Sequence, residues 1–359
     1  MVNIIYFRTD ANDTIATGHV MRCLTIADVL KKRGQQISFI VSDSQSEELI
    51  VKAEYNVYTL GTDWKIWDIG READFIKQHA SKKDVLVVDS YSVSSEYIRQ
   101  VGKHIRTVVF DDMFSEYYPA DIIINYNLYY KIFDYDSRYN QNTKLLLGGK
   151  YVPLRSQFRE YHVDRTGADI ENKRPAEVLL ICGGGDAYNT MGQILARTLE
   201  SDRNIFEQLR WNVVCGAYNG NYEQIKEMSL QNSNVIVHQN VKNMAGLMAE
   251  CDVCISAAST VLYECSAMQL PTVFYCVADN QQYDADCFGE NDRMLYCGDF
   301  IKESGQTIKN IISNLKKIIG DNERYLYMVE ASKNSVDCNG ACNIADEIIK
   351  DADIKEMVL

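Results

Sequence analysis

The sequence lacks any apolar run of about 18 residues, the length that a membrane-spanning helix needs. Its first residues also lack the basic stretch and the long apolar stretch of a secretory signal. Basic residues are outnumbered, because 37 Lys and Arg stand against 50 Asp and Glu, which gives a formal net charge of −13. These absences predict a cytoplasmic protein without membrane insertion, and they argue against a nucleic-acid binder.

A dense framework of closely spaced cysteines is absent as well. The 11 cysteines are spread through apparent strands and helices, as is typical of reduced thiols. Cys251 and Cys254 form a Cys-x-x-Cys pair, and Cys338 and Cys342 stand close together in the tail. A structural zinc needs four converging ligands, and a redox motif of this kind opens a helix, whereas this one enters a strand. We interpret these cysteines as core thiols and predict neither a metal nor a cofactor.

The chain is long enough for two domains. Its 359 residues correspond to two domains of roughly 150 residues each, and its 46% hydrophobic and 24% charged residues are ordinary for a globular protein. Strands are predicted at 3–7, 36–41, 85–88, 107–110 and 121–125, and then at 177–182, 211–214, 235–238, 253–256 and 272–275. Helical spacing appears between them, for example at 19–32, 68–80 and 190–199.

Strand and helix alternation predicts the α/β class, with parallel sheets covered on both faces. We expect an N-terminal Rossmann-like domain over 1–155, a polar linker over 156–175 and a second Rossmann-like domain over 176–335. Two such domains facing across a cleft would place a ligand between them. A helical tail follows at 336–359. The sequence leaves open whether the last helices close the second domain or cross back over the first.

The most informative motif follows the first predicted strand. It contains Arg8 and Asp10, and then Thr-Gly-His-Val-Met-Arg-Cys over 17–23. Gly18 permits a tight turn, and His19 falls in the first turn of the next helix. A helix N-terminus disfavours a positively charged imidazole, so His19 is a candidate general base. The alternative interpretation is that His19 is a structural residue, which caps the helix or forms a hydrogen bond within the protein.

Two further turns follow strands in the second half. Gly183, Gly184 and Gly185 expose backbone N–H groups before a helix start near Thr190. Their spacing matches neither a dinucleotide fingerprint nor a P-loop, so diphosphate binding and a plain tight turn stay equal alternatives. Ser259 and Thr260 cap a later helix and can face phosphate oxygens, and Glu264 can reach a ribose.

Polar residues also end three other strands. Asp279, Asn280, Gln281 and Gln282 form one cluster after the strand at 272–275. In the first half, Asp89-Ser90-Tyr91 and Asp111-Asp112 face the same edge of the predicted sheet. Paired aspartates can bind a metal, but adjacent residues point in different directions and no further ligands accompany them. We interpret Asp111 and Asp112 as capping or loop residues.

Taken in order, these motifs resemble the PseG hydrolases of pseudaminic acid biosynthesis and the related SpsG spore-coat polysaccharide proteins, over about residues 1–335. The resemblance implies a GT-B architecture like that of MurG. It also implies metal-independent hydrolysis of UDP-2,4-diacetamido-2,4,6-trideoxy-β-L-altropyranose at the anomeric C–O bond, which gives UDP and free sugar. The C-terminal residues beyond 335 extend past the core of the resemblance.

By the motif match, the catalytic residues are His19, Tyr91 and Asn280. UDP is assigned to Gly183, Gly184, Gly185, Ser259, Thr260 and Glu264, and the sugar or its loop to Asp10, Gly18, Arg22 and Gln281. Ala16 and Ala258 occupy positions where we expect glycine in the family, and an added Cβ there can alter a loop near the diphosphate.

Two other functions compete with hydrolysis. A GT-B glycosyltransferase would pass the sugar to an alcohol, and usually presents an apolar and basic membrane-facing patch, which this acidic sequence lacks. A binding module without turnover would hold a UDP-sugar but would not need His19, Tyr91 and Asn280 together. The sequence does not specify the oligomeric state.

Overall fold

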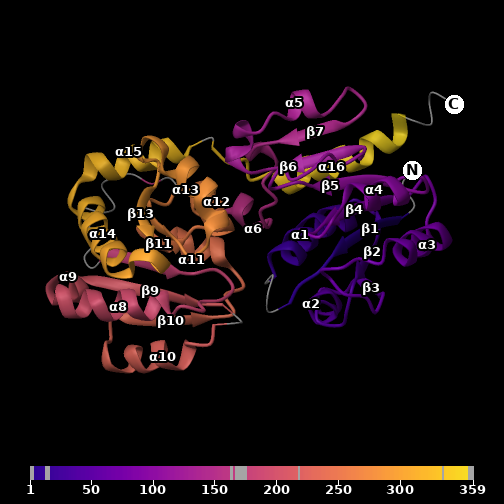
Figure 1. Cartoon of the computed structure of the whole chain (residues 1–359). Coiled ribbons are helices and arrows are strands. Elements are labelled where there is room, and N and C mark those ends of the chain that lie inside the picture. The colour runs from indigo at the N-terminus through magenta and orange to yellow at the C-terminus, as the bar shows by residue number, and fades with distance from the viewer. Residues whose placement is uncertain are drawn as a thin grey trace. The chain divides into compact units, whose positions relative to one another are not determined.

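A computed structural model describes residues 4–12, 17–161, 165, 176–216, 219–333 and 335–354 (Figure 1). The chain divides into two units. The first unit holds residues 1–155 and 337–359, and the second holds 156–336. Each unit is built on its own parallel sheet, and each is described by itself below.

The first unit contains a seven-stranded sheet in the order β3-β2-β1-β4-β5-β6-β7, with all neighbours parallel. Its strands are β1 (Ile4–Thr9), β2 (Gln36–Val41), β3 (Asn56–Thr59), β4 (Val85–Asp89), β5 (Arg106–Phe110), β6 (Ile122–Asn125) and β7 (Lys144–Leu147). The central strands β1, β4 and β5 are almost wholly buried, because both faces of a parallel sheet are covered.

Helices and short 3₁₀ turns connect these strands. They are α1 (Gly18–Lys32), α2 (Glu47–Lys52), α3 (Ile69–His79), α4 (Ser95–Val101), η1 (Leu128–Ile132), α5 (Tyr135–Arg138) and η2 (Gly149–Tyr151). Helix α1 buries an apolar stripe that includes Val20, Leu24, Ala27 and Leu30, as its spacing predicted.

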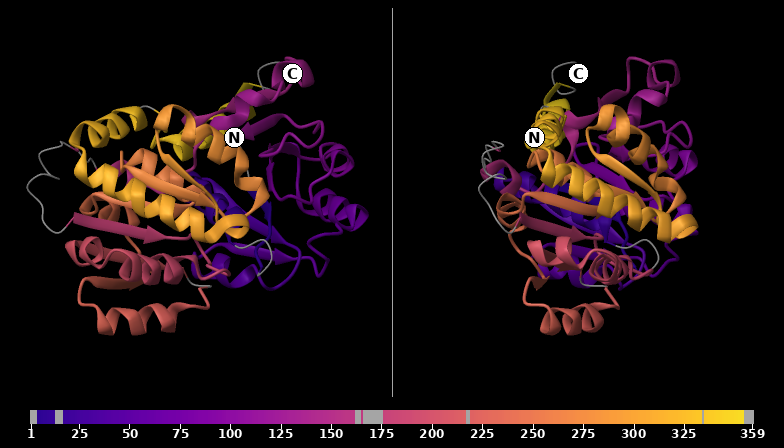
Figure 2. Two further views of the ribbon diagram at one scale, coloured as in Figure 1. Left: turned by 60° about the vertical axis from the view of Figure 1, so that its left-hand side comes forward. Right: turned by 90° about the vertical axis from the view of Figure 1, so that its left-hand side faces the viewer.

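The second unit contains a six-stranded parallel sheet in the order β10-β9-β8-β11-β12-β13. Its strands are β8 (Ala176–Ile181), β9 (Leu209–Cys215), β10 (Val235–Gln239), β11 (Val253–Ala257), β12 (Thr272–Cys276) and β13 (Leu295–Asp299). Helix α14 (Phe300–Gly320) packs along β12 and β13 (Figure 2), and buries an apolar stripe of Ile308, Ile311, Ile312 and Leu315.

The other helical segments of this unit are short. They are α6 (Gln157–Glu160), α8 (Thr190–Ser201), α9 (Arg203–Gln208), α10 (Tyr222–Gln231), α11 (Met244–Glu250), α12 (Thr260–Ala267), η3 (Asp279–Gln281), α13 (Gln282–Gly289), η4 (Glu290–Asp292) and α15 (Asn322–Ser332). Among the described residues, no helix is long and apolar enough to cross a membrane.

Both sheets follow the Rossmann strand order, and each has a point where that order reverses. The reversal lies between β1 and β4 in the first unit, and between β8 and β11 in the second. Ligands of open α/β sheets bind beyond the carboxyl ends of the strands at this point. The fold therefore directs attention to the segments that follow these four strands.

The end of the chain returns to the first unit. Helix α16 (Gly340–Ile354) packs against α1, with Ile344 and Ile348 fully buried. Arg33 forms an ion pair with Asp346 at 2.7 Å, and Arg106 donates to the carbonyl oxygen of Ile348 at 2.8 Å. The structure thus decides the alternative that the sequence left open: α14 and α15 belong to the second unit, and α16 belongs to the first.

The stretch predicted as a linker contributes to the second unit. It contains α6, and the buried guanidinium of Arg165 donates to the carbonyl oxygens of Met248, Cys251 and Met268. These carbonyls lie at the C-terminal ends of α11 and α12, where a cation is favoured by the helix dipole. Residues 162–164 and 166–175 of the predicted linker lie outside the described part of the chain.

Candidate active site

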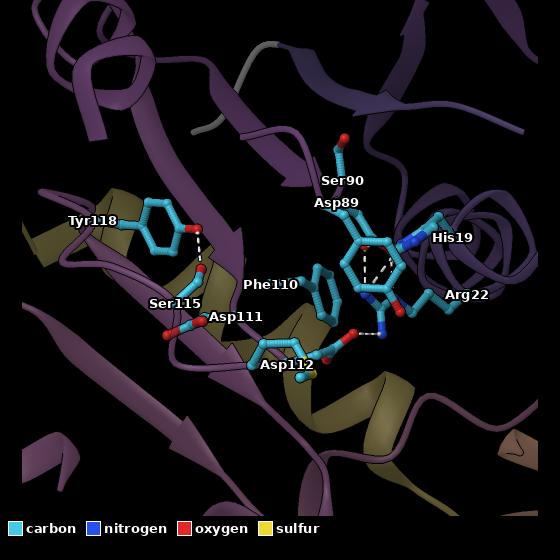
Figure 3. Close-up of a pocket in the computed structure, with 11 residues that line it drawn as sticks. His19, Arg22, Asp89, Ser90, Phe110, Asp111, Asp112, Ser115 and Tyr118 are labelled. Carbon is cyan, nitrogen blue, oxygen red and sulfur yellow. Dashed lines mark hydrogen bonds and ion pairs between the residues drawn. The ribbon is translucent and has the colours of Figure 1, made fainter. Parts of the chain in front are cut away.

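A cavity of about 110 Å³ lies in the first unit beyond the ends of β4 and β5 (Figure 3). The N-terminal turn of α1 and the segments that follow β4 and β5 supply its walls. The lining residues are His19, Arg22, Asp89, Ser90, Tyr91, Phe110, Asp111, Asp112, Met113, Ser115 and Tyr118. The cavity is therefore found where the strand order reverses, and it includes the histidine that the sequence singled out.

His19 is held by a carboxylate on a neighbouring strand. Its side chain is buried, and its Nδ1 atom lies 2.6 Å from Oδ1 of Asp89, the last residue of β4. A carboxylate only accepts hydrogen bonds, so Nδ1 carries the proton of this contact. In the neutral ring the other nitrogen, Nε2, is then left with a lone pair. The helix cap is Thr17, so His19 does not serve as the capping residue.

The same carboxylate is clamped by Arg22, one turn further along α1. Nε and Nη2 of Arg22 donate to the two oxygens of Asp89, and Nη1 reaches Asp112 at 2.8 Å and the Tyr126 hydroxyl at 2.9 Å. Burial alone raises the pKa of Asp89, but Arg22 and His19 outweigh it and hold that pKa well below its usual range. Asp89 is therefore ionised wherever the protein is folded near neutral pH.

Arg22 was predicted to contact the sugar or its loop, but in the structure its guanidinium group is engaged by other side chains of the first unit. Its side chain is only 10% exposed and lies over the Phe110 ring at 4.5 Å. Asp112, interpreted from sequence as a capping or loop residue, is instead the second anion of this cluster, and it also accepts from Asn127 at 3.2 Å. The aspartates are far apart in sequence from Arg22, so spacing alone could not join them.

Asp111 is a second buried carboxyl on the cavity wall. The Tyr135 hydroxyl lies 3.3 Å from its Oδ2 atom. Burial raises the pKa of Asp111 to about 6, with a further contribution from the charge of Asp112.

Phe114, in the loop that follows, has a φ of 52°, a left-handed conformation that is strained for a bulky residue. Arg138 holds it by donating to its carbonyl oxygen at 2.8 Å.

Tyr91, which the resemblance assigns to the catalytic residues, lies beside His19. Its ring meets the imidazole edge-on, with 4.5 Å between centroids and 84° between planes, while the side chain stays largely exposed. Asp10 is placed differently, because its carboxylate is buried against Arg8 at 2.6 Å and accepts from the backbone N–H of Ser42 at 2.7 Å. The sequence had assigned Asp10 to the sugar or its loop, and the contacts show it in an internal network.

Gly18 differs from its expected local role. It is the first residue of α1 and does not have the positive φ of a tight turn, and an added Cβ would meet nothing within 4 Å. Ala16 lies outside the described residues. Ala258 is buried after β11, and its N–H donates to the carbonyl oxygen of Tyr275 at 2.7 Å, without a positive φ. At Ala258, therefore, the backbone conformation makes no demand for glycine.

In the second unit, the glycine turn and the start of α12 meet at the reversal between β8 and β11. Gly183 has a φ of +72°, which favours glycine, and a Cβ built there would lie 3.9 Å from Oγ of Ser259. Ser259 caps α12 by accepting from the N–H of Val261 at 3.3 Å. Thr260 follows as an exposed first helical residue, and Glu264 lies partly buried one turn later.

A carboxylate of the protein itself, that of Asp186, caps the start of α8, the helix after the glycine turn. The sequence analysis did not identify this contact. The Asp186 carboxylate is buried and accepts from the N–H groups of Thr190 at 2.7 Å and Met191 at 3.0 Å. These amides begin α8, which the sequence had treated as favourable for a phosphate. Because the Asp186 carboxylate already accepts from these amides, they are not available to donate to a phosphate, and its negative charge offsets the positive potential of the helix N-terminus.

The closing polar cluster also belongs to the second unit. Asn280 is exposed in η3 after β12. Gln281 is partly committed, because its Oε1 atom accepts from the N–H of Val277 at 2.8 Å. Among the described residues, no group of three or more His, Cys, Asp or Glu side chains is placed to hold a metal ion, and all 11 cysteines are free thiols.

Solved structures that share this fold include glycosyltransferases. MurG of Acinetobacter baumannii superimposes with a TM-score of 0.67, at 14% identity and covering 97% of this chain and 99% of its own. The UDP-glucose complex of UGT71G1 from Medicago truncatula has a TM-score of 0.63, at 13% identity and 98% coverage of both chains. With two parallel Rossmann-like sheets, this likeness defines a protein of the GT-B fold class, as predicted.

No family model matches the chain. Relatives found by sequence are more informative than the fold alone, because two of them have named roles. UDP-2,4-diacetamido-2,4,6-trideoxy-beta-L-altropyranose hydrolase of Campylobacter jejuni is 25% identical over 283 residues, 78% of this chain and 94% of that protein. SpsG of Bacillus subtilis, named as a spore coat polysaccharide biosynthesis protein, is 24% identical and covers 78% and 79%. These relatives confirm the resemblance to the PseG and SpsG proteins. The chain spans only 57% of a third relative, MJ1062 of Methanocaldococcus jannaschii, at 25% identity.

Proposed function

We propose that this protein hydrolyses a UDP-linked 2,4-diacetamido-2,4,6-trideoxy sugar to UDP and free sugar, in the synthesis of pseudaminic acid or a related surface polysaccharide. The observation that carries the proposal is the 2.6 Å contact between His19 and Asp89 on the wall of the cavity. It supplies an oriented base without a metal. The Campylobacter jejuni relative, a hydrolase of such a sugar, supports the choice of substrate.

In the proposed reaction, water attacks the anomeric carbon while Nε2 of His19 takes its proton. The new C–O bond joins the water oxygen to the sugar, and the bond from the anomeric carbon to the β-phosphate oxygen breaks. The electron pair leaves with UDP. The imidazolium that forms is stabilised by the ionised Asp89 on its Nδ1 side. A cavity of about 110 Å³ beside His19 has room for several water molecules, which supports water as the acceptor.

The leaving group is assigned to the second unit. Backbone amides of Gly183–Gly185 and the start of α12 at Ser259 and Thr260 would face the diphosphate, where electrostatic stabilisation of the departing charge counts most. Glu264 would bind the ribose, and Asn280 and Tyr91 would orient substituents of the sugar. The internal carboxylate at α8 favours α12 over α8 as the helix that meets the phosphates.

Product analysis in water enriched with ¹⁸O tests this proposal. The protein is incubated with UDP-linked diacetamido sugars and no other acceptor, and the products are analysed by mass spectrometry. We expect catalytic release of free sugar that carries the label, and unlabelled UDP. Label in UDP would mean attack at phosphorus and would contradict the mechanism.

A GT-B glycosyltransferase is the second candidate, because the solved structures that share the fold include transferases. It predicts only trace release of free sugar without an acceptor, and release of UDP together with a glycoside of the alcohol once an acceptor is added. A binding module predicts UDP binding with no turnover of any substrate in the panel. The incubation without acceptor therefore identifies a hydrolase, and a second incubation with an alcohol acceptor, together with a UDP-binding measurement, separates the other two functions.

A further inference from the structure

The glycine turn of the second unit rests against the segment that follows β9. Gly216 is the first residue after that strand. A Cβ built on Gly216 would lie 2.4 Å from the carbonyl oxygen of Gly184 and 2.6 Å from that of Gly183. Side chains do not occur at such distances from backbone atoms. The turn therefore keeps its observed position only because Gly216 has no side chain.

A second contact joins the same two segments. Nδ2 of Asn221 donates to the carbonyl oxygen of Asp186 at 2.6 Å, immediately after the glycines. Asn221 is itself held, because its N–H donates to Oδ1 of Asn219 at 2.8 Å, and the N–H of Asn219 donates to the carbonyl oxygen of Gly216 at 3.1 Å. Gly216 and Asn221 thus support the turn from two ends.

We infer that Gly216 and Asn221 are positioning residues that set the Gly183–Gly185 amides for the diphosphate of a UDP-sugar. This inference rests on the proposed function, and it assigns a role to two residues that no motif indicated. The peptide group is planar, so a shift of the Gly184 carbonyl moves the N–H of Gly185 with it. A displacement of about 1 Å is enough to lose much of the benefit of oriented donors.

The chain offers a closely matched control. Gly220 lies in the same segment, has no positive φ, and a Cβ built there meets nothing within 4 Å. Gly216 also lacks a positive φ, so alanine at either position fits the backbone conformation. Gly216→Ala and Gly220→Ala therefore add the same methyl group, and they differ in what that group meets.

Binding of UDP and of uridine to the full chain tests the inference. Affinities are measured by calorimetry for UDP and by ligand-observed NMR for uridine, with melting curves for every variant. We expect Gly216→Ala to raise the Kd for UDP at least tenfold and to leave the Kd for uridine within about twofold, because uridine has no phosphate. Gly220→Ala should match the parent for both ligands.

Unchanged UDP binding in a folded Gly216→Ala protein would overturn the inference, and so would equal losses for UDP and uridine. If Gly216→Ala does not fold, Asn221→Ala replaces it, and it should again weaken UDP and spare uridine; equal effects on the two ligands would overturn the inference. Failure of the parent to bind UDP is a separate outcome, which would contradict the proposed function itself.

Discussion

Nδ1 of His19 and Oδ1 of Asp89 lie 2.6 Å apart, although the two residues are separated by 70 positions in the sequence. The contact joins the first turn of α1 to the end of β4. The contact places the proton of the neutral ring on Nδ1, and it leaves Nε2 with a lone pair that can accept a proton. The predictions below begin from this pair.

Asp89→Asn should reduce kcat by about 10²-fold or more, because an amide no longer selects the required tautomer or stabilises the imidazolium. UDP affinity should be unchanged, since the UDP residues are assigned to the second unit. The measurement is steady-state kinetics with UDP calorimetry. The double variant His19→Asn/Asp89→Asn should be no slower than His19→Asn alone, because the two residues act as one unit. Additive losses would contradict this coupling.

His19→Asn should fold normally and bind UDP nearly as the parent does, but lose turnover by about 10²-fold or more. Asparagine keeps a side-chain N–H that can donate to Asp89, so a purely structural role of His19 in this contact would be largely preserved. Product release by mass spectrometry and UDP binding by calorimetry give the two readouts. Retained turnover in a folded variant would return His19 to a structural role.

Asp111→Asn should stabilise the protein near neutral pH. The pKa of this carboxyl is raised to about 6, chiefly by burial, so the folded state binds the proton more tightly than the unfolded chain does. Ionised Asp111 therefore costs stability as the pH rises from about 4 to 6, and the full cost remains above 6. Urea unfolding at pH 4.5 and 7.5 should show a stabilisation that is larger at pH 7.5 by on the order of 1 to 2 kcal/mol. A gain that does not depend on pH would contradict this account.

Asp186→Ala should lower the free energy of unfolding by about 1 to 2 kcal/mol, because the first amides of α8 lose their acceptor. Asp186→Asn keeps one acceptor oxygen and should lose less. Chemical denaturation of both variants, with the parent as reference, measures the difference. Equal stability of the alanine variant and the parent would show that water replaces the carboxylate without cost.

A chelator such as EDTA should leave turnover unchanged. The carboxylates nearest His19 are already engaged, since Arg22 binds both Asp89 and Asp112, and Asn127 donates to the other oxygen of Asp112. Activity is compared before and after dialysis against chelator, with added Mg²⁺ and Mn²⁺ as controls. Loss on chelation with recovery by one of these ions would overturn the metal-independent mechanism.

The sequence by itself determined the α/β class and most of the buried strands. Runs such as 85–88 and 122–124 are apolar throughout, because a central parallel strand is covered on both faces. The strands that the sequence analysis missed, β3, β7 and β13, all lie at sheet edges. An edge strand is less covered and needs no continuous apolar run, as the largely exposed Asn56–Thr59 shows.

His19 and Tyr91, and likewise Gly183 and Ser259, were also indicated by sequence, because each follows a predicted strand and parallel strands end at one edge of a sheet. Only the tertiary structure decided their partners. Asp89 against His19, Arg22 between two aspartates, and Gly216 beneath the glycine turn are contacts between elements distant in the chain. Local spacing specifies which face of an element a residue occupies. Which side chain meets it there depends on how the strands are ordered in the sheet.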